Sequence, residues 1–203
     1  VSNSGVVASD TTGVGSARLG LAAASYDGSD KAIFGFGNTG SITSITNLVG
    51  NNGVIASDTS GVGTARNYLA AASYGGDKAL FGYGATGSAD TTRSSLTNKV
   101  SNSGVVASDT TGVGTARLLL AAAKYGGDKA VFAYGSNSSG MSNISNKVSN
   151  SGVVATDTAG VGTGRFNAAA AKYGGDKALF GYGFNAIANL SMTNLVSNVG
   201  VVS

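Results

Sequence analysis

A phrase of roughly fifty residues occurs four times in this 203-residue chain, and this repetition limits the possible folds more than any other feature of the sequence. A single unit of that length cannot bury its own apolar face, so the units must pack against one another. We expect one repeat domain over residues 1–203, with units at 1–48, 49–99, 100–147 and 148–195 and the start of a fifth copy at 196–203. The phrase V-(S/G)-N-x-G-V-(V/I) marks each start, at Val1, Val49, Val100, Val148 and Val196.

Each unit has the pattern of short strands. In the segment KAVFAYG, alternation predicts that Ala130, Phe132 and Tyr134 share one face and that Val131 and Ala133 share the other. The preceding YGGDK places paired glycines between two apolar runs, which indicates a tight hairpin turn. The segment LLLAAAKY has good helix formers, but it is short, is flanked by glycine and has no capping residues, so a strand is favoured. Two more strands around SNKVSN and GVVASDT make four per unit.

The composition removes most catalytic chemistry. The chain has no Cys, His, Trp or Pro, and all ten acidic residues are Asp. Without Cys and His there is no thiolate nucleophile, no usual general base and no common zinc ligand. A glycosidase would need two carboxylates at a controlled separation in different environments, which a symmetric repeat does not supply. We therefore expect no catalytic residues, no metal, no cofactor and no enzymatic activity.

Charge and hydropathy also exclude two classes of partner. The net charge is +3, and the 13 Lys and Arg are spread along the chain without a run of three, so a nucleic-acid surface is not expected. No apolar stretch approaches the length that spans a membrane, and the first ten residues lack the pattern of a signal peptide.

Four short strands in a unit of this length are typical of a β-propeller blade. The order of Arg, apolar strand, Gly-Gly turn, aromatic strand ending in Gly, Asn-containing strand and a last strand leading to the next Arg resembles the kelch repeat. Two departures are that the paired glycines precede the second strand and that the usual tryptophan is missing. The segments GGDKALFGYG and NLVSN-G-VVASDTTGVGTAR also resemble repeat arrays encoded by phages of marine cyanobacteria and other aquatic bacteria, in proteins taken to be virion or tail-fibre components.

This resemblance implies an all-β propeller of about four kelch-like, four-stranded blades in a virion or another extracellular assembly. Crowding near a propeller axis would explain the repeated Ala-Ala-Ala run, and the Phe and Tyr of the next strand would fill the wider space between blades. We expect the N-terminal segment to pair with the C-terminal repeat and close the ring. The alternatives are a β-solenoid and a segment of a longer repeat array.

Most of the charged residues recur at fixed repeat positions. We interpret the repeated Asp and Arg as structural ion pairs that set the register of the blades, the alternative being four equivalent anion or sugar sites. The D-T-(T/S/A)-G segments could suggest calcium, but one Asp per loop favours an Asx or Ser/Thr turn. The predicted ion-pair residues are Asp10, Arg18, Asp58, Arg66, Asp109, Arg117, Asp157 and Arg165.

Positions that differ between the units are candidates for recognition. They follow the repeated Arg and the aromatic strand, and they combine aromatic rings with amide and charged groups, which suits sugar binding. The alternative is that their aromatic rings pack between blades. The candidate ligand-binding residues are Asn67, Tyr68, Asp90, Arg93, Phe166, Asn167 and Phe184.

These observations favour a non-enzymatic structural or adhesive module. Its expected partners are other protein chains of an assembly, and its expected location is a virion or the extracellular space. The alternative is a lectin-like propeller that recognises cell-surface glycans through its variable loops. Neither hypothesis requires nucleic acid or insertion into a membrane.

Overall fold

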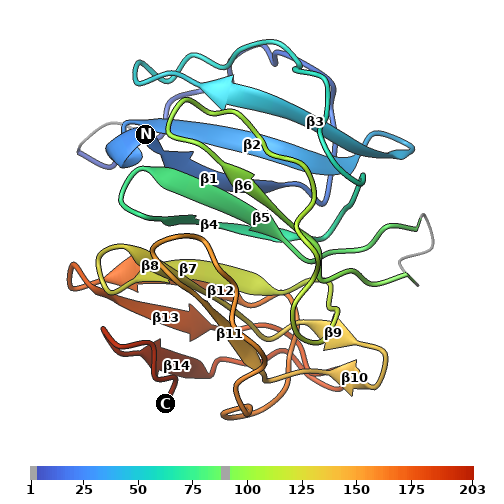
Figure 1. Ribbon diagram of the computed structural model, residues 1–203, viewed down its shortest axis with the longest axis vertical. Helices are drawn as coiled ribbons and strands as arrows, with labels where there is room; N and C mark the ends of the chain where they lie inside the picture. Colours follow the sequence, from blue (N-terminus) through green and yellow to red (C-terminus); the bar gives the residue numbers. More distant parts are fainter. Residues whose placement is uncertain (1–3, 88–91) are drawn as a thin grey trace.

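The computed structural model describes residues 4–87 and 92–203 and is built from β-strands joined by turns (Figure 1). No α-helix occurs in these two segments, and η1 (Asp27–Ser29) is a single 3-10 turn. The all-β prediction is therefore confirmed. The strands are β1 (Ala22–Tyr26), β2 (Lys31–Asn38), β3 (Ile42–Val49), β4 (Ala70–Tyr74), β5 (Lys78–Gly82), β6 (Thr97–Val100), β7 (Ala121–Tyr125), β8 (Lys129–Ala133), β9 (Ser136–Asn137), β10 (Gly140–Met141), β11 (Ser145–Val148), β12 (Ala169–Tyr173), β13 (Lys177–Gly181) and β14 (Thr193–Val196).

The strands form four equivalent antiparallel sheets and one small hairpin, β9–β10. Sheet 1 contains β1, β2 and β3, and sheet 2 contains β4, β5 and β6. Sheet 3 contains β7, β8 and β11, and sheet 4 contains β12, β13 and β14. In each sheet the Ala-rich strand is the inner strand, the aromatic strand is in the middle and the Asn-containing strand is outermost.

The Ala-rich segments are strands, as the sequence predicts. In sheet 3, β7 pairs with β8 from Ala121↔Ala133 to Tyr125↔Lys129. Gly126 and Gly127 make the hairpin turn with φ of 58° and 78°. Backbone at such positive φ strains any residue with a Cβ, which explains the paired glycines at this place.

A fourth strand is only partly formed in each unit. The chain after the outer strand folds back beside it and touches it at two isolated bridges in each of sheets 1 to 3, for example Val100↔Val106 and Thr97↔Thr110 in sheet 2, and at the single bridge Val196↔Val202 in sheet 4. Each unit therefore has three regular strands and one extended edge segment in place of the four regular strands expected.

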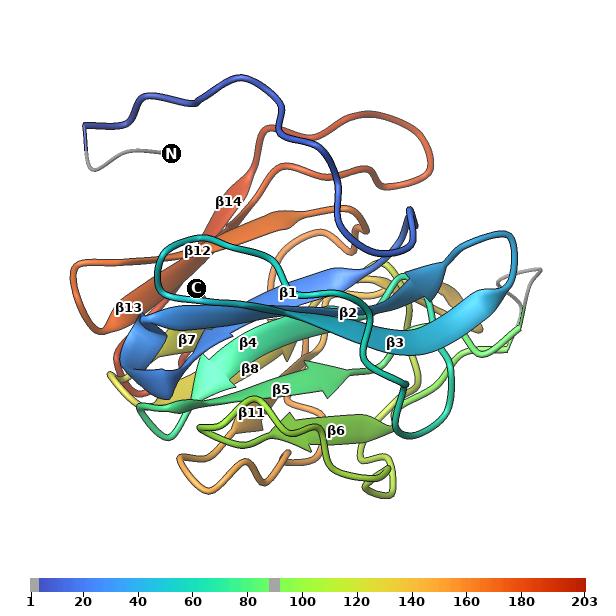
Figure 2. The same ribbon diagram turned by 90° about the horizontal axis from the view of Figure 1, so that it is seen from above.

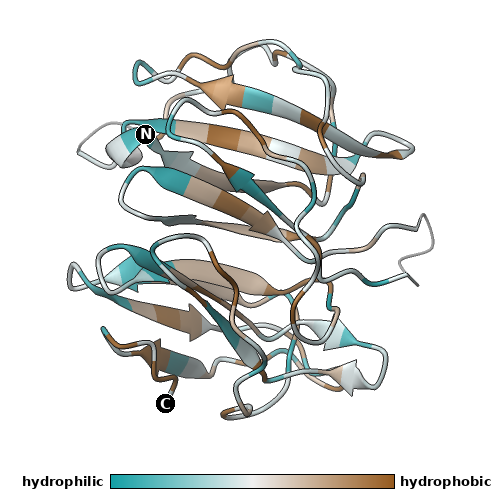
Figure 3. Ribbon diagram, viewed as in Figure 1, coloured by the Kyte–Doolittle hydropathy of each residue, from teal (hydrophilic) through white to brown (hydrophobic). Residues whose placement is uncertain are grey.

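The four sheets follow one another in chain order, and their inner strands lie together around one pocket; we call the direction of the inner strands through this pocket the shared axis. Strand β1 packs against β4, β4 against β7 and β7 against β12. We call the side of each sheet that faces the next sheet in chain order its forward face, and the opposite side its backward face. Apolar residues lie mainly along the middle strands, whereas the hairpin turns are hydrophilic (Figure 3).

Aromatic rings fill the junctions between successive sheets. Phe36 of sheet 1 contacts Phe81 of sheet 2 with ring centroids 5.1 Å apart. Tyr83 and Phe132 repeat this contact at 5.2 Å, and Tyr134 and Phe180 repeat it at 5.4 Å. All six rings are fully buried, so these junctions form the core of the molecule.

The predicted alternation along the middle strand is wrong at its last aromatic residue. Phe132 belongs to the core between sheets 2 and 3, whereas Tyr134 belongs to the core between sheets 3 and 4. The reason is a positive φ of 65° at Tyr134, which interrupts the pleat and turns the ring to the forward face. The same conformation occurs at Phe36, Tyr83 and Tyr182.

The predicted closure by the N-terminal segment is not seen in the described part of the chain. The edge of β14 is covered by the segment that follows it, through Val196↔Val202 and two hydrogen bonds between Leu195 and Ser203. Residues 7–15 form no backbone hydrogen bond with sheet 4 and run as an extended segment outside the sheets (Figure 2). The two segments have nearly the same sequence, and the contiguous one needs only a short loop to reach its place.

Candidate functional site

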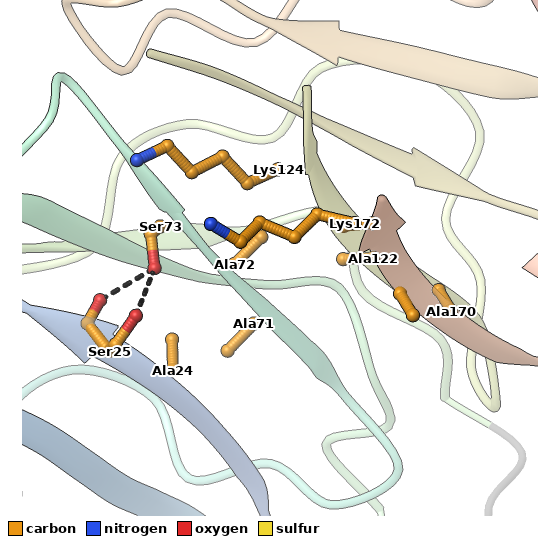
Figure 4. A pocket seen from close by; sticks show the side chains of 11 residues that line it. Ala24, Ser25, Ala71, Ala72, Ser73, Ala122, Lys124, Ala170 and Lys172 are labelled. Carbon is orange, nitrogen blue, oxygen red and sulfur yellow. Dashed lines mark hydrogen bonds between the residues drawn. The ribbon is translucent and has the colours of Figure 1, made fainter. Parts of the chain in front are cut away.

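The inner strands of all four sheets line a pocket of about 250 Å³ on the shared axis. Its walls are mainly Ala side chains, because each inner strand presents its Ala-rich segment to the axis. Figure 4 shows the polar groups at this site, which come from the residue preceding the Tyr of each inner strand. This residue is Ser25 in sheet 1, Ser73 in sheet 2, Lys124 in sheet 3 and Lys172 in sheet 4.

The two serines bind each other, and the two lysines do not. Ser73 Oγ donates a hydrogen bond of 2.7 Å to the Ser25 carbonyl, and the two hydroxyls are 2.8 Å apart. Lys124 and Lys172 extend side by side across the pocket (Figure 4). Neither lysine forms a hydrogen bond or ion pair with the described residues. The pocket is therefore divided into a neutral hydroxyl half and a cationic half.

No acidic residue lines this pocket to balance the two ammonium groups. The four lysines of the hairpin turns differ, because each has an Asp within 3.0 Å. Two adjacent cations without a carboxylate suit an anionic group such as a sulfate, a phosphate or a sugar carboxylate. We name Ser25, Ser73, Lys124 and Lys172 the axial quartet.

A second pocket, of about 370 Å³, lies on the same axis at the other end of the inner strands. Tyr68 and Asn167, which the sequence indicated as ligand-binding residues, both line it beside Gly20 and Leu119. The backbone links these four equivalent positions in a row, since Tyr68 N donates to Gly20 O, Leu119 N to Tyr68 O and Asn167 N to Leu119 O. Of the predicted candidates, these two are brought together at one pocket.

The other candidate ligand residues lie apart from this pocket. Phe166 and Phe184 pack edge to face with centroids 5.5 Å apart, so they stabilise each other. Asn67 is buried and pairs through its backbone with Ala85. Arg93 donates to Ser136 of the β9–β10 hairpin. Asp90 lies outside the described residues.

The repeated Arg and Asp residues meet at an Asn that the sequence analysis did not single out. In sheet 2, Arg66 donates to Asn98 Oδ1 at 2.5 Å, and its Nη1 lies 3.4 Å from Asp109. Asn98 Nδ2 in turn donates to Asp109 at 2.9 Å and to the Ala107 carbonyl at 3.1 Å. The amide therefore joins the outer strand, the edge segment and the Arg that enters the sheet.

Sheet 1 contains the same cluster, and sheets 3 and 4 contain it with a change. In sheet 1, Arg18 lies 3.6 Å from Asp58 and donates to Asn47. In sheet 3, Arg117 donates to Asn146 and to the Ile144 carbonyl rather than directly to Asp157. In sheet 4, Arg165 donates to Asn194 at 2.8 Å, and no carboxylate of the described residues contacts it.

Each carboxylate in these clusters also accepts from the glycine-rich segment before the Arg. Asp109 accepts from the backbone N–H of Thr64 at 3.0 Å and from its hydroxyl at 2.6 Å. Partial burial raises the pKa of Asp109, but the hydrogen bonds from Thr64 and Asn98 outweigh this and hold it below its ordinary value. Asp157 has a lowered pKa for the same reasons, with Thr115 and Asn146 as donors. The carboxylates therefore stay ionised, and they hold the glycine-rich segment before each Arg in place through these hydrogen bonds.

The buried Arg residues also lie on the aromatic rings of the preceding sheet. The guanidinium of Arg66 is 4.7 Å from the centroid of Phe36, that of Arg117 is 4.9 Å from Tyr83 and that of Arg165 is 3.8 Å from Tyr134. Each Arg thus touches an aromatic ring on one side and an Asn on the other. This position explains the Arg of the second, third and fourth repeats.

The axial lysines were missed because they fall inside a segment that reads as structural. The signal is present as AAASY in the first two units and AAAKY in the last two. A change from Ser to Lys at an otherwise constant strand position is a difference between repeats, but only the arrangement around an axis places the four residues together.

Among the described residues, no three acidic side chains converge in a group that could hold a metal ion. No helix in this part of the chain is long and apolar enough to cross a membrane. Comparison with protein-family models and with curated proteins finds no match to this chain.

Proposed function

We propose that this protein is a non-enzymatic structural or adhesive module that binds other protein chains through the faces of its end sheets. The observation that carries the proposal is the exposure of Tyr182. Its equivalents Phe36, Tyr83 and Tyr134 are fully buried by the following sheet, whereas 62% of Tyr182 is exposed. A surface built like three internal protein junctions and left uncovered is suited to a protein partner.

The repeating sheets support a scaffold made of propeller blades. We propose that sheets 1 to 4 are kelch-like blades of a propeller-type array, because their inner strands share an axis and their middle strands carry the aromatic junctions. The resemblance to phage repeat arrays supports a location in a virion or another extracellular assembly. In that setting the blades act as a spacer or decoration.

This proposal can be tested by sedimentation velocity on the 203-residue chain over a wide concentration range. A structural module that binds protein chains predicts species heavier than the 19.7 kDa monomer, increasing with concentration. A single 19.7 kDa species at all concentrations, together with retention on a glycan array, would instead favour a lectin.

The alternative candidate is recognition of acidic glycans, which the axial quartet favours. Two ammonium groups and two hydroxyls around one pocket can bind a sulfated or carboxylated sugar. The double variant Lys124→Ser/Lys172→Ser restores the residue found in sheets 1 and 2, so it is expected to fold and to lose retention on acidic glycans. Lys99→Ser removes a lysine outside the pocket and is the charge control.

The aromatic residue of the second axial pocket provides an independent test of glycan binding. Tyr68→Ala removes a partly buried ring from that pocket and should lower retention if sugars stack there. The matched variant Phe166→Ala removes a ring that packs on Phe184, so it should lower stability without a specific loss of glycan. Retention unaffected both by Tyr68→Ala and by Lys124→Ser/Lys172→Ser would contradict binding along the axis.

A further inference from the structure

Each junction between two sheets is completed by one short segment of chain. In the segment from Asp58 to Arg66, Asp58 binds the cluster of sheet 1 and Arg66 lies on the ring of Phe36 in that same sheet. The segment then continues into sheet 2. The segments from Asp109 to Arg117 and from Asp157 to Arg165 have the same two ends, with the Asp and the Arg always eight residues apart.

Sheet 4 has both groups that bind such a segment in the other sheets, namely an aromatic ring that an Arg can cover and an Arg–Asn pair that an Asp can join. No described residue binds either group in this way. Tyr182 has the backbone conformation of Tyr134, with φ of 62° against 65°, but no guanidinium lies on its ring. Arg165 is fully buried and bound to Asn194, but no carboxylate joins them.

Near the start of the sequence, Asp10 and Arg18 are the residues that would bind such groups, but they lack these partners among the described residues. Arg18 is held by Asn47 and Asp58 within sheet 1, but no aromatic ring among the described residues lies under its guanidinium. Asp10 is exposed and makes no hydrogen bond or ion pair with the described residues. Asp10 and Arg18 are also eight residues apart, the spacing found in the three internal segments.

The forward face of sheet 4 and the backward face of sheet 1 both expose residues whose equivalents are buried at the internal junctions. The forward face of sheet 4 exposes the residues whose equivalents are buried in sheets 2 and 3, notably Tyr173 and Tyr182. The backward face of sheet 1 leaves Phe34 half-buried, whereas its equivalents in the other sheets are fully buried. Gly53, whose equivalents Gly104 and Gly152 lie against a Tyr of the preceding sheet, has open space beside it.

We propose that a second copy of this chain docks head to tail on sheet 4. Its Phe34 face covers Tyr182, its Arg18 lies on the ring of Tyr182, and its Asp10 completes the cluster of Arg165 and Asn194. One continuous segment of the second copy supplies both groups, as the three internal segments do. The interface continues the stacking already formed three times within the chain.

A second copy is the fitting partner because the described residues leave Tyr182 exposed and Arg165 without a carboxylate, while Asp10 and Arg18 have the spacing of the three internal segments. Sheet 1 of the same chain leaves Tyr182 exposed, and residues 7–15 form no backbone hydrogen bond with sheet 4. A head-to-tail contact joins two different surfaces, so repeating it yields a ring of several chains or a filament. This inference rests on the proposed function and specifies its protein partner.

The test uses one variant at each end of the chain. We call the forward face of sheet 4 the tail, and the backward face of sheet 1 with the segment from Asp10 to Arg18 the head. Tyr182→Ser changes only the tail and Asp10→Asn changes only the head. Both residues are exposed, so both variants are expected to fold. The wild-type chain should self-associate, whereas the affinity of self-association of each variant alone should be lower by a factor of at least about ten. Ile187→Ser and Asp30→Asn are the controls for loss of an exposed apolar and an exposed acidic residue, and they should assemble like the wild type.

Mixing the two variants gives the decisive result. The head of Tyr182→Ser and the tail of Asp10→Asn are both intact, so the mixture should form complexes of one chain of each kind, with the mass of two chains by light scattering. Self-association that both variants retain, or a mixture that forms no complex, would overturn the head-to-tail contact while leaving a structural module possible. A monomeric wild type whose melting temperature falls in Asp10→Asn would also overturn it, since the contacts would then form within one chain.

Discussion

Tyr134 and Tyr182 occupy equivalent positions at the ends of the middle strands of sheets 3 and 4, and they differ in what covers them. Tyr134 is fully buried, with the ring of Phe180 at 5.4 Å and the guanidinium of Arg165 at 3.8 Å. Tyr182 has the same positive φ, but 62% of it is exposed. The repeat therefore determines the direction of the ring, and the neighbouring sheet determines whether the ring is buried.

Phe132→Ala should strongly destabilise the fold. The ring is fully buried between sheets 2 and 3 and packs against Tyr83. Removing it leaves a cavity, so the free energy of unfolding should fall by about 3–5 kcal/mol. Chemical denaturation followed by circular dichroism measures this.

Phe34→Ala is the matched control for that change, because Phe34 holds the same position in sheet 1 and is only half-buried. At protein concentrations where the chain is monomeric, the loss should be less than half as large. Equal losses for the two variants would show that Phe34 is already covered within the monomer.

Gly152→Ala should destabilise more than Gly53→Ala. Both glycines have a positive φ, 74° and 78°, so both variants should lose about 1–2 kcal/mol from backbone strain. A Cβ at Gly152 would also lie 2.6 Å from Tyr74, whereas a Cβ at Gly53 meets nothing within 4 Å. Thermal unfolding of both variants isolates the steric part, and equal melting temperatures would contradict the close packing of Tyr74.

Asn98→Ala should lower the free energy of unfolding by about 2–3 kcal/mol, because the buried guanidinium of Arg66 loses its acceptor and Asp109 loses a donor. Asn194→Ala provides the comparison, since that amide has no carboxylate partner among the described residues. We expect the smaller loss there, measured by urea denaturation. A larger loss at Asn194 would mean that the carboxylate contributes little to the cluster.

Stability should also fall steeply in alkaline solution. Burial raises the pKa of Tyr83 from 10.0 to about 12, so the unfolded chain loses this proton at lower pH than the folded chain does. The contribution of Tyr83 is complete below pH 10 and is lost as the pH rises towards 12. Tyr83→Phe should flatten the pH dependence of the melting temperature over this range, and an unchanged slope would exclude Tyr83 as its source.

Several features of the fold follow from local sequence. The Gly-Gly pairs predict hairpins because only glycine readily takes a positive φ at both turn positions, and the short Ala-rich runs between glycines predict strands. The repeat spacing predicts equivalent units. The face of Tyr134 could not be predicted in this way, since a positive φ at an aromatic residue is strained and is held only by the packing on both sides of it.

The candidate sites also differ in whether the local sequence or only the tertiary structure decides them. The sequence by itself determined the repeated strands and their hairpin turns, because these depend on contacts within one repeat. It also indicated that the repeated Asp and Arg are structural, and ion pairs form at Arg18–Asp58 and Arg66–Asp109, each between residues of successive units. Only the tertiary structure decided that Ser25, Ser73, Lys124 and Lys172 share one pocket and that Arg165 and Tyr182 lack the partners their equivalents have. These outcomes depend on how whole sheets lie around the axis and on which face has a neighbour, and no local pattern encodes either.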